Sequence, residues 1–286
     1  MTGDDLVLRE RHGAVLELRL NNPPFNGISG PLLVAYMSAL EEARLDDGVR
    51  AIVTTADGPS WCAGGDLTQL KDGEPDRSLS DMLHESTAES ASLSMIERHA
   101  DRLGPGRHVL AIDAFDKPMI AAVSGAAAGG GFALALLHDL RFASERALFT
   151  VAFTRVGLSM EMGMSYLLPR AIGPQAAFDL AVTSRRVGAD EALALGLIWR
   201  VVPHEDLVAT AIAYAQDLAT LPPLGVQITT RLLRRTWDTT LRQQLETEWP
   251  WQVAAFASPD ARHAIAAFFD RSGPEVVPPP RTKEKK

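Results

Sequence analysis

Near its middle the chain reads Lys117-Pro-Met-Ile-Ala-Ala-Val-Ser-Gly-Ala-Ala-Ala-Gly-Gly-Gly-Phe-Ala-Leu-Ala135, and this stretch decides the fold. Its first part is apolar, is typical of a β-strand and ends at Gly125, and the glycines Gly129, Gly130 and Gly131 lead into an apolar segment typical of a helix. The first N–H groups of a helix have no partner inside the helix, and they lie at the positive end of its dipole. The sequence therefore predicts a strand, a glycine turn and a helix whose first turn can bind an oxygen carrying negative charge.

A second turn of the same kind comes earlier in the chain. It reads Pro59-Ser-Trp-Cys-Ala-Gly-Gly-Asp-Leu67 and follows the apolar segment 49–55, which is typical of a strand. Two such turns can supply two N–H donors, the minimum for an oxyanion hole that stabilises charge developing on a carbonyl oxygen. We expect the N–H groups of Ala63 and Gly130 to be these donors.

The same residues resemble a known family. The segment Trp61-Cys-Ala-Gly-Gly-Asp66 is similar to the phenylalanine-x-alanine-glycine-x-aspartate turn of the crotonase superfamily, which includes enoyl-CoA hydratases and isomerases. The stretch Ile120 to Ala143 is similar to the second signature of that family, and further likeness extends over residues 5 to 272. The resemblance implies an α/β fold, built as a crotonase-type spiral of ββα units with a C-terminal helical trimerisation region. It also implies an acyl-CoA thioester as the substrate.

Composition narrows the function classes. The chain has 286 residues, of which 46% are hydrophobic, which is enough for a substantial core. Its net charge of -8 argues against a nucleic-acid partner. No apolar run approaches the roughly 18 residues that cross a bilayer, and the start of the chain is acidic where a signal peptide would be basic, so we expect a cytoplasmic protein without a membrane partner. Cys62 is the single cysteine, which excludes an intrachain disulfide.

The order of patterns along the chain predicts its organisation. A hairpin over residues 5 to 20 turns at His12-Gly13, a helix spans Gly30 to Leu45, and a strand covers 50 to 55. Strand, turn and helix then repeat through residues 118 to 202. We expect a core domain over 1–203, a helical region over 204–272 and a disordered tail over 273–286, with a loop over the polar residues 71–80.

The acids depart from the family pattern. Hydratases of this family carry one glutamate just after the glycine triplet and a second one further along, and the pair activates water. By the resemblance, these positions hold Ala133 and Phe153, neither of which can move a proton. The ordinary two-glutamate hydration mechanism is therefore not expected.

One acid remains near the motifs. In Gly157-Leu-Ser-Met-Glu-Met-Gly163, Glu161 stands where several crotonase-type isomerases carry an acid that exchanges protons with the substrate. Apolar neighbours, the methionines Met160, Met162 and Met164, would raise its pKa toward the range of a general base. The alternative is that Glu161 caps the following helix or faces solvent.

The remaining candidates follow from the resemblance. It implies that the CoA adenine packs near Asp66 and Leu67, and that Arg271 from a neighbouring subunit meets a CoA phosphate. We expect Trp61, Phe132, Ala133 and Phe153 to contribute to an apolar substrate pocket. No cofactor other than the CoA of the substrate is expected, and no metal, because the seven histidines show no ligand spacing. We interpret Cys62 as a buried thiol and His138 as a hydrogen-bonded core histidine rather than as catalytic groups.

The reaction predicted from these residues is double-bond isomerisation of an acyl-CoA, in which two N–H groups hold the enolate and Glu161 is the single acid/base. Two alternatives stay open. The chain could be a specialised biosynthetic member that uses substrate-assisted chemistry, or a non-catalytic acyl-CoA-binding member. The resemblance also implies a homotrimer or a dimer of trimers.

Overall fold

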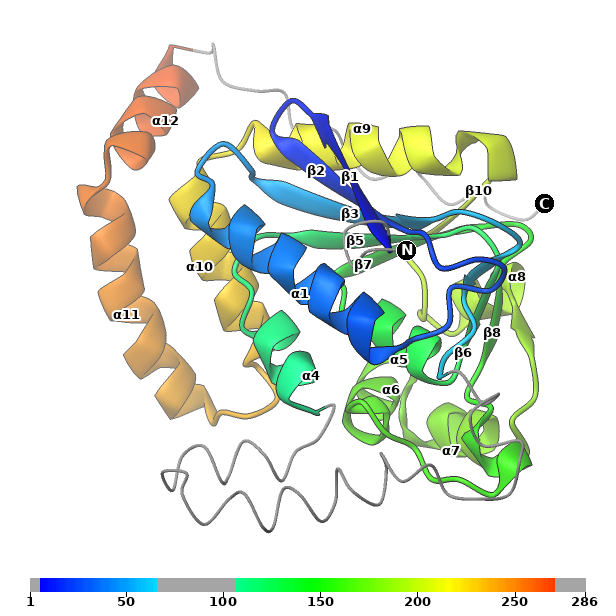
Figure 1. Ribbon diagram of the computed structural model, residues 1–286. Coiled ribbons are helices and arrows are strands. Elements are labelled where there is room, and N and C mark those ends of the chain that lie inside the picture. Colours follow the sequence, from blue (N-terminus) through cyan, green and yellow to red (C-terminus); the bar gives the residue numbers. More distant parts are fainter. Residues whose placement is uncertain (1–5, 66–105, 271–286) are drawn as a thin grey trace, which may run out of the picture. The chain divides into compact units, whose positions relative to one another are not determined.

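The computed structural model describes residues 6–65 and 106–270 of the chain (Figure 1). Contacts between α-carbons group the chain through Gln216 into one compact unit and the chain from Asp217 into a second. The change from one unit to the other falls inside helix α9 (Leu207–Ala219). The domain boundary expected after residue 203 stays a prediction, and the expected loop over 71–80 and tail over 273–286 lie outside the described residues.

The first unit is built on a large, mainly parallel sheet, in which only the first two strands run antiparallel. The hairpin turns at Gly13, where a φ of 65° favours glycine. In spatial order the strands are β1 (Val7–His12), β2 (Val15–Leu20), β3 (Ala51–Ala56), β5 (Met119–Val123), β7 (Leu140–Ser144) and β10 (Arg200–Val202).

A smaller second sheet is built mainly from strands that come directly after β3, β5 and β7 of the large sheet. Its strands, in order, are β4 (Ser60–Cys62), β6 (Ala126–Ala128), β8 (Leu148–Thr150) and β9 (Val187–Gly188). Because β3, β5 and β7 each pass directly into β4, β6 and β8, the chain alternates between the two sheets. The predicted repeat of ββα units is therefore confirmed.

Helices connect and cover these sheets. Helix α1 (Gly30–Leu45) begins where predicted, because the Ser29 side chain accepts a hydrogen bond from the Leu32 N–H and caps it. It packs against β1 and β2 and buries Tyr36 and Leu40 (Figure 1). The other helical segments of this unit are α4 (Gly106–Asp113), α5 (Gly130–Leu136), η4 (Phe153–Val156), α6 (Met164–Ile172), α7 (Pro174–Thr183), α8 (Ala189–Ala194) and η5 (His204–Asp206).

The second unit is helical. Helices α10 (Pro223–Arg234), α11 (Leu241–Ala257) and α12 (Pro259–Phe269) contact one another. Across the described part of the chain, no helix combines the length and the apolar character that spanning a bilayer requires.

Candidate active site

The first glycine turn follows β4 directly. The N–H of Ala63 donates to the carbonyl oxygen of Phe25 at 2.9 Å, and the N–H of Gly64 hydrogen bonds to the Cys62 thiol. The carbonyl of Gly64 accepts from the Ile28 N–H at 2.7 Å. Within the described residues, no hydrogen bond uses the N–H of Gly65. Of the three turn amides, Gly65 therefore offers the proton that a ligand can accept.

This arrangement corrects the sequence prediction for the first oxyanion donor. Ala63 was the expected donor, but its proton is engaged by Phe25, a residue far away in the sequence. We therefore replace Ala63 by Gly65 as the candidate. No local sequence signal distinguishes the two, because both lie in the same small-residue turn.

The second turn lies between β6 and α5. Gly129 has a φ of 51°, which favours glycine, and its N–H donates to the Thr150 carbonyl at 3.0 Å. Helix α5 begins at the next residue, Gly130, whose N–H has no hydrogen-bond partner among the residues described. The expected donor Gly130 is thus placed with its N–H available.

The two turns touch each other. A Cβ on Gly64 would lie 2.6 Å from the Ala128 carbonyl oxygen and 3.2 Å from the Gly130 nitrogen. A Cβ on Gly131 would lie 2.2 Å from the Cys62 carbonyl oxygen. Since ordinary contacts begin well beyond these distances, only glycine fits at either position. The close approach brings the Gly65 and Gly130 amides onto adjoining turns, as an oxyanion hole requires.

Three of the expected pocket residues lie in the core instead. Trp61, Phe132 and Ala133 are each 0% exposed. The ring of Phe132 packs on Phe149 with centroids 5.4 Å apart. In this structure these side chains are part of the core and present no surface to a substrate.

Phe153 occupies a different place. It lies at the start of η4, and its ring is 3.7 Å from where a Cβ on Gly129 would be. It therefore packs beside the second glycine turn, and its role in substrate binding stays a prediction. Three other expected residues, Asp66, Leu67 and Arg271, lie outside the described residues.

Glu161 lies in the loop between η4 and α6. Its neighbour Met162 is buried, has a φ of 51° and places its sulfur 3.1 Å from where a Cβ on Gly130 would be. The Glu161 residue is exposed, but neighbouring atoms withdraw part of its carboxyl group from water, which raises its pKa above the ordinary value. The helix-cap alternative for Glu161 is wrong, since α6 has Gly163 at its N-cap and no side chain caps it. The other alternative, that Glu161 faces solvent, agrees with the exposure of the residue, and its role as an acid/base stays a prediction.

Cys62 and His138 behave as the sequence predicts. Burial raises the pKa of the Cys62 thiol to about 12, so it is not a nucleophile at neutral pH. His138 is buried, with Nδ1 2.9 Å from the Leu134 carbonyl and Nε2 2.7 Å from the Thr54 hydroxyl. Because a carbonyl oxygen can only accept, Nδ1 donates to Leu134, and both ring nitrogens have hydrogen-bond partners inside the core. This histidine ties the end of α5 to β3.

Comparison with known proteins tests the family resemblance that the two glycine turns suggest. Residues 10–276 match the family described as Enoyl-CoA hydratase/isomerase. The chain is 32% identical to the 1,2-epoxyphenylacetyl-CoA isomerase of Escherichia coli (strain K12), over 96% of this chain and 98% of that protein. It is 28% identical to a 4-chlorobenzoyl coenzyme A dehalogenase-1 of an Arthrobacter species, over 93% and 91% of the two chains.

A solved structure shows the same fold. The crystal structure of an enoyl-CoA hydratase/isomerase from Cupriavidus metallidurans CH34 matches with a TM-score of 0.83 at 30% identity, and the match covers 98% of each chain. The resemblance drawn from the two glycine turns is confirmed by these matches. This chain therefore belongs to the enoyl-CoA hydratase/isomerase family of the crotonase superfamily.

Proposed function

We propose that the protein isomerises a double bond in an acyl-CoA thioester. The observation that carries the proposal is the pair of touching glycine turns with the N–H groups of Gly65 and Gly130 available to a ligand. Both amides would donate to the thioester carbonyl oxygen. Hydrogen bonds to this oxygen stabilise the enolate, because its negative charge is greatest there.

In this mechanism Glu161 is the only acid/base. Its carboxylate takes a proton from the carbon next to the thioester, and the electrons of that C–H bond spread over the acyl chain to the thioester oxygen. The same carboxyl group returns the proton to the far carbon of the extended enolate, which moves the double bond by one position. The raised pKa of Glu161 suits a group that must both take and give a proton.

The acyl group is expected to be apolar. Phe153 lies beside Gly129, and the buried Met162 lies against Gly130, so the described surroundings of the second turn are apolar. Two of the relatives are named for aromatic acyl-CoA compounds, which fits such surroundings. A panel of aliphatic and aromatic acyl-CoA thioesters, followed by mass spectrometry and proton exchange with D₂O, tests the proposal. Exchange without isomerisation would favour substrate-assisted chemistry, and binding without either would favour the non-catalytic alternative.

Hydration of crotonyl-CoA is expected to be slow. Ala133 is fully buried, and neither the methyl group of Ala133 nor the ring of Phe153 can take up or release a proton, so neither residue can activate water. We expect turnover about a hundredfold to ten-thousandfold below that of a two-glutamate hydratase of the family, measured by loss of enoyl-thioester absorbance with such a hydratase as the positive control. Efficient hydration would contradict both the assignment of these two positions and the isomerase mechanism.

We also propose that the chain assembles as a homotrimer or a dimer of trimers. Helices α11 and α12 have no buried residue in the described chain, although both are rich in large apolar side chains. Exposed apolar surface on this scale usually marks an interface. The side chains concerned are Leu241, Leu245, Trp249, Val253, Phe256, Ile265, Phe268 and Phe269.

Light scattering at micromolar concentration tests the assembly. We expect the mass of three or six chains of 30.9 kDa each. Trp249→Glu should shift the mass toward one chain, because it places a charge in the apolar surface. The control Glu248→Gln, at the neighbouring position, should leave the mass unchanged. A wild-type protein with the mass of one chain would refute the assembly.

A further inference from the structure

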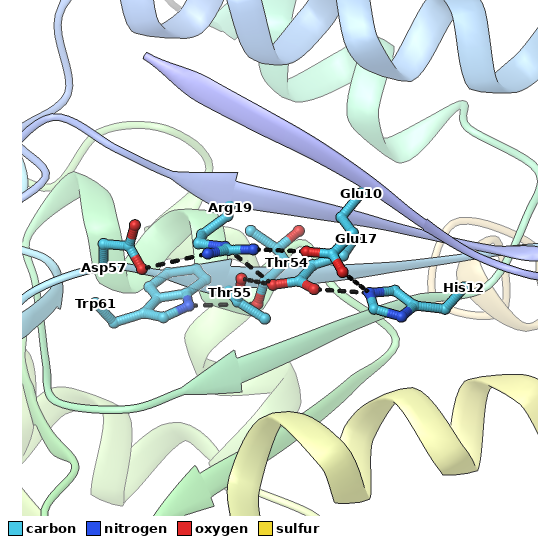
Figure 2. Close-up of polar contacts among 8 residues, drawn as sticks. All are labelled: Glu10, His12, Glu17, Arg19, Thr54, Thr55, Asp57 and Trp61. Carbon is cyan, nitrogen blue, oxygen red and sulfur yellow. Dashed lines mark hydrogen bonds and ion pairs between the residues drawn. The ribbon is translucent and has the colours of Figure 1, made fainter. Parts of the chain in front are cut away.

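The N-terminal hairpin brings together two carboxylates and an imidazole (Figure 2). Strand register places Glu10 of β1 directly opposite Glu17 of β2, and His12 follows two residues later on the same face of β1. The His12 Nε2 lies 2.9 Å from Glu17 Oε2 and 3.7 Å from Glu10 Oε1. One ligand-type atom from each of the three side chains therefore lies within 4.8 Å of the other two.

Thr55 and Arg19 donate hydrogen bonds to the two carboxylates. Thr55 donates its hydroxyl to Glu17 Oε1 at 2.6 Å, and an Arg19 amino group donates to Glu10 Oε2 at 2.8 Å. Both contacts use the carboxylate oxygens that face away from His12, as Figure 2 shows. Glu17 is also only 4% exposed, so its carboxylate has little freedom to turn away. The two oxygens facing His12 are thus oriented by groups outside the ligand set.

We propose that Glu10, His12 and Glu17 bind one divalent transition-metal ion, with Zn²⁺ as the representative. Imidazole nitrogen and carboxylate oxygen are ligands that Zn²⁺ accepts. Ligand atoms about 2.0–2.2 Å from a tetrahedral zinc lie roughly 3.4 Å apart, and the two distances from His12 Nε2 bracket this value. The two carboxylate oxygens lie within 4.8 Å of each other, and Glu10, whose side chain is 55% exposed, has room to adjust that spacing.

The net charge of the side chains around the site is negative, which favours binding of a divalent cation. Glu10, Glu17 and Asp57 contribute three negative charges to the network. Arg19 contacts all three and offsets one of them, so a divalent ion would neutralise the rest. Like charges directly opposite each other in a hairpin are unfavourable, and a bound ion removes that repulsion. The ion would tie β1 to β2, and through the Thr55 hydrogen bond to β3.

This inference departs from the sequence prediction that the chain has no metal site. The histidine spacing along the chain gave no signal because the ligands come from two strands and only one is a histidine. The inference is independent of the proposed isomerase activity, since none of the three residues belongs to the glycine turns or to the Glu161 loop.

Titration of the chelator-treated, untagged full chain with ZnCl₂ in a calorimeter tests the site, with CoCl₂ absorption as a second readout. We expect one ion per chain, a visible Co²⁺ spectrum and a higher midpoint of thermal unfolding with Zn²⁺. His12→Ala should weaken binding by at least the roughly 10–100-fold that loss of a hydrogen bond to a ligand costs. Glu17→Gln should have a similar effect, and circular dichroism checks that both variants fold.

The matched control is His263→Ala, which removes an exposed histidine on α12 and should leave the affinity unchanged. Absence of Zn²⁺ binding by the wild type would overturn the proposal, and the cluster would then be a His12–Glu17 hydrogen-bonded pair only. Binding that survives His12→Ala would overturn it equally, because the ion would then lie elsewhere.

Discussion

Replacing Glu161 by glutamine is expected to lower isomerase turnover by about a hundredfold to ten-thousandfold, or about 3–5 kcal/mol of transition-state stabilisation. Glutamine keeps the shape of the side chain but cannot take a proton. Acyl-CoA affinity should change little, because the oxyanion donors are backbone N–H groups of other residues. The measurement is kcat and KM for the best thioester of the panel, together with a dissociation constant for a non-reactive analogue.

The pH profile gives an independent check on the same residue. As a base, Glu161 works only when ionised, so activity falls as the pH drops through its pKa. Because partial desolvation raises that pKa, the acid limb of kcat/KM should lie above the ordinary range of a glutamate. The limb should vanish in Glu161→Gln.

A matched control separates this effect from a general loss of charge. Glu205 is an exposed glutamate in η5 of the same unit, and Glu205→Gln should leave turnover unchanged. Full activity of Glu161→Gln would exclude Glu161 as the base. An unchanged acid limb in that variant would do so as well.

Gly131→Ala is expected to have the second large effect. Its methyl group would lie 2.2 Å from the Cys62 carbonyl oxygen, and the nearest atoms belong to the Cys62 backbone and Cβ, which cannot swing aside. The two turns must therefore separate. Overpacking of this kind costs about 1–3 kcal/mol or more in stability. Loss of one correctly placed oxyanion donor costs about a hundredfold to a thousandfold in turnover.

Gly188→Ala is the matched control, because a methyl group there meets nothing within 4 Å and φ is -80°. We expect wild-type stability and turnover for this variant. Urea unfolding and steady-state kinetics on both proteins make the comparison. If Gly131→Ala kept full turnover, contact between the two turns would not be needed for catalysis.

Local chemistry was enough to predict much of the fold. Helix α1 spans the predicted residues because Ser29 caps it and its apolar residues recur at helical spacing. The hairpin follows from alternating residues on both sides of Gly13, and the glycine turns from runs of small residues after apolar strands. Each of these signals acts between neighbours in the sequence, so the sequence carries it directly.

The state of each amide at the site was decided by tertiary structure. Whether Ala63 or Gly65 has a free N–H depends on the Phe25 carbonyl, which reaches the turn only after folding. Trp61, Phe132 and Ala133 looked like pocket residues because an apolar pocket and an apolar core have the same composition.

The hairpin cluster and the surroundings of the Glu161 loop also depend on contacts between residues that are distant in the chain. Glu10 and Glu17 become neighbours through strand register, and Thr55 joins them from a third strand. Glu161 was identified from a local motif, but only the folded chain shows that its neighbour Met162 packs against Gly130. The sequence by itself determined which elements form and which chemical groups the chain carries, because those depend on local spacing. Only the tertiary structure decided which N–H groups stay free and which side chains meet, because hydrogen bonding and burial depend on partners that are distant in the chain.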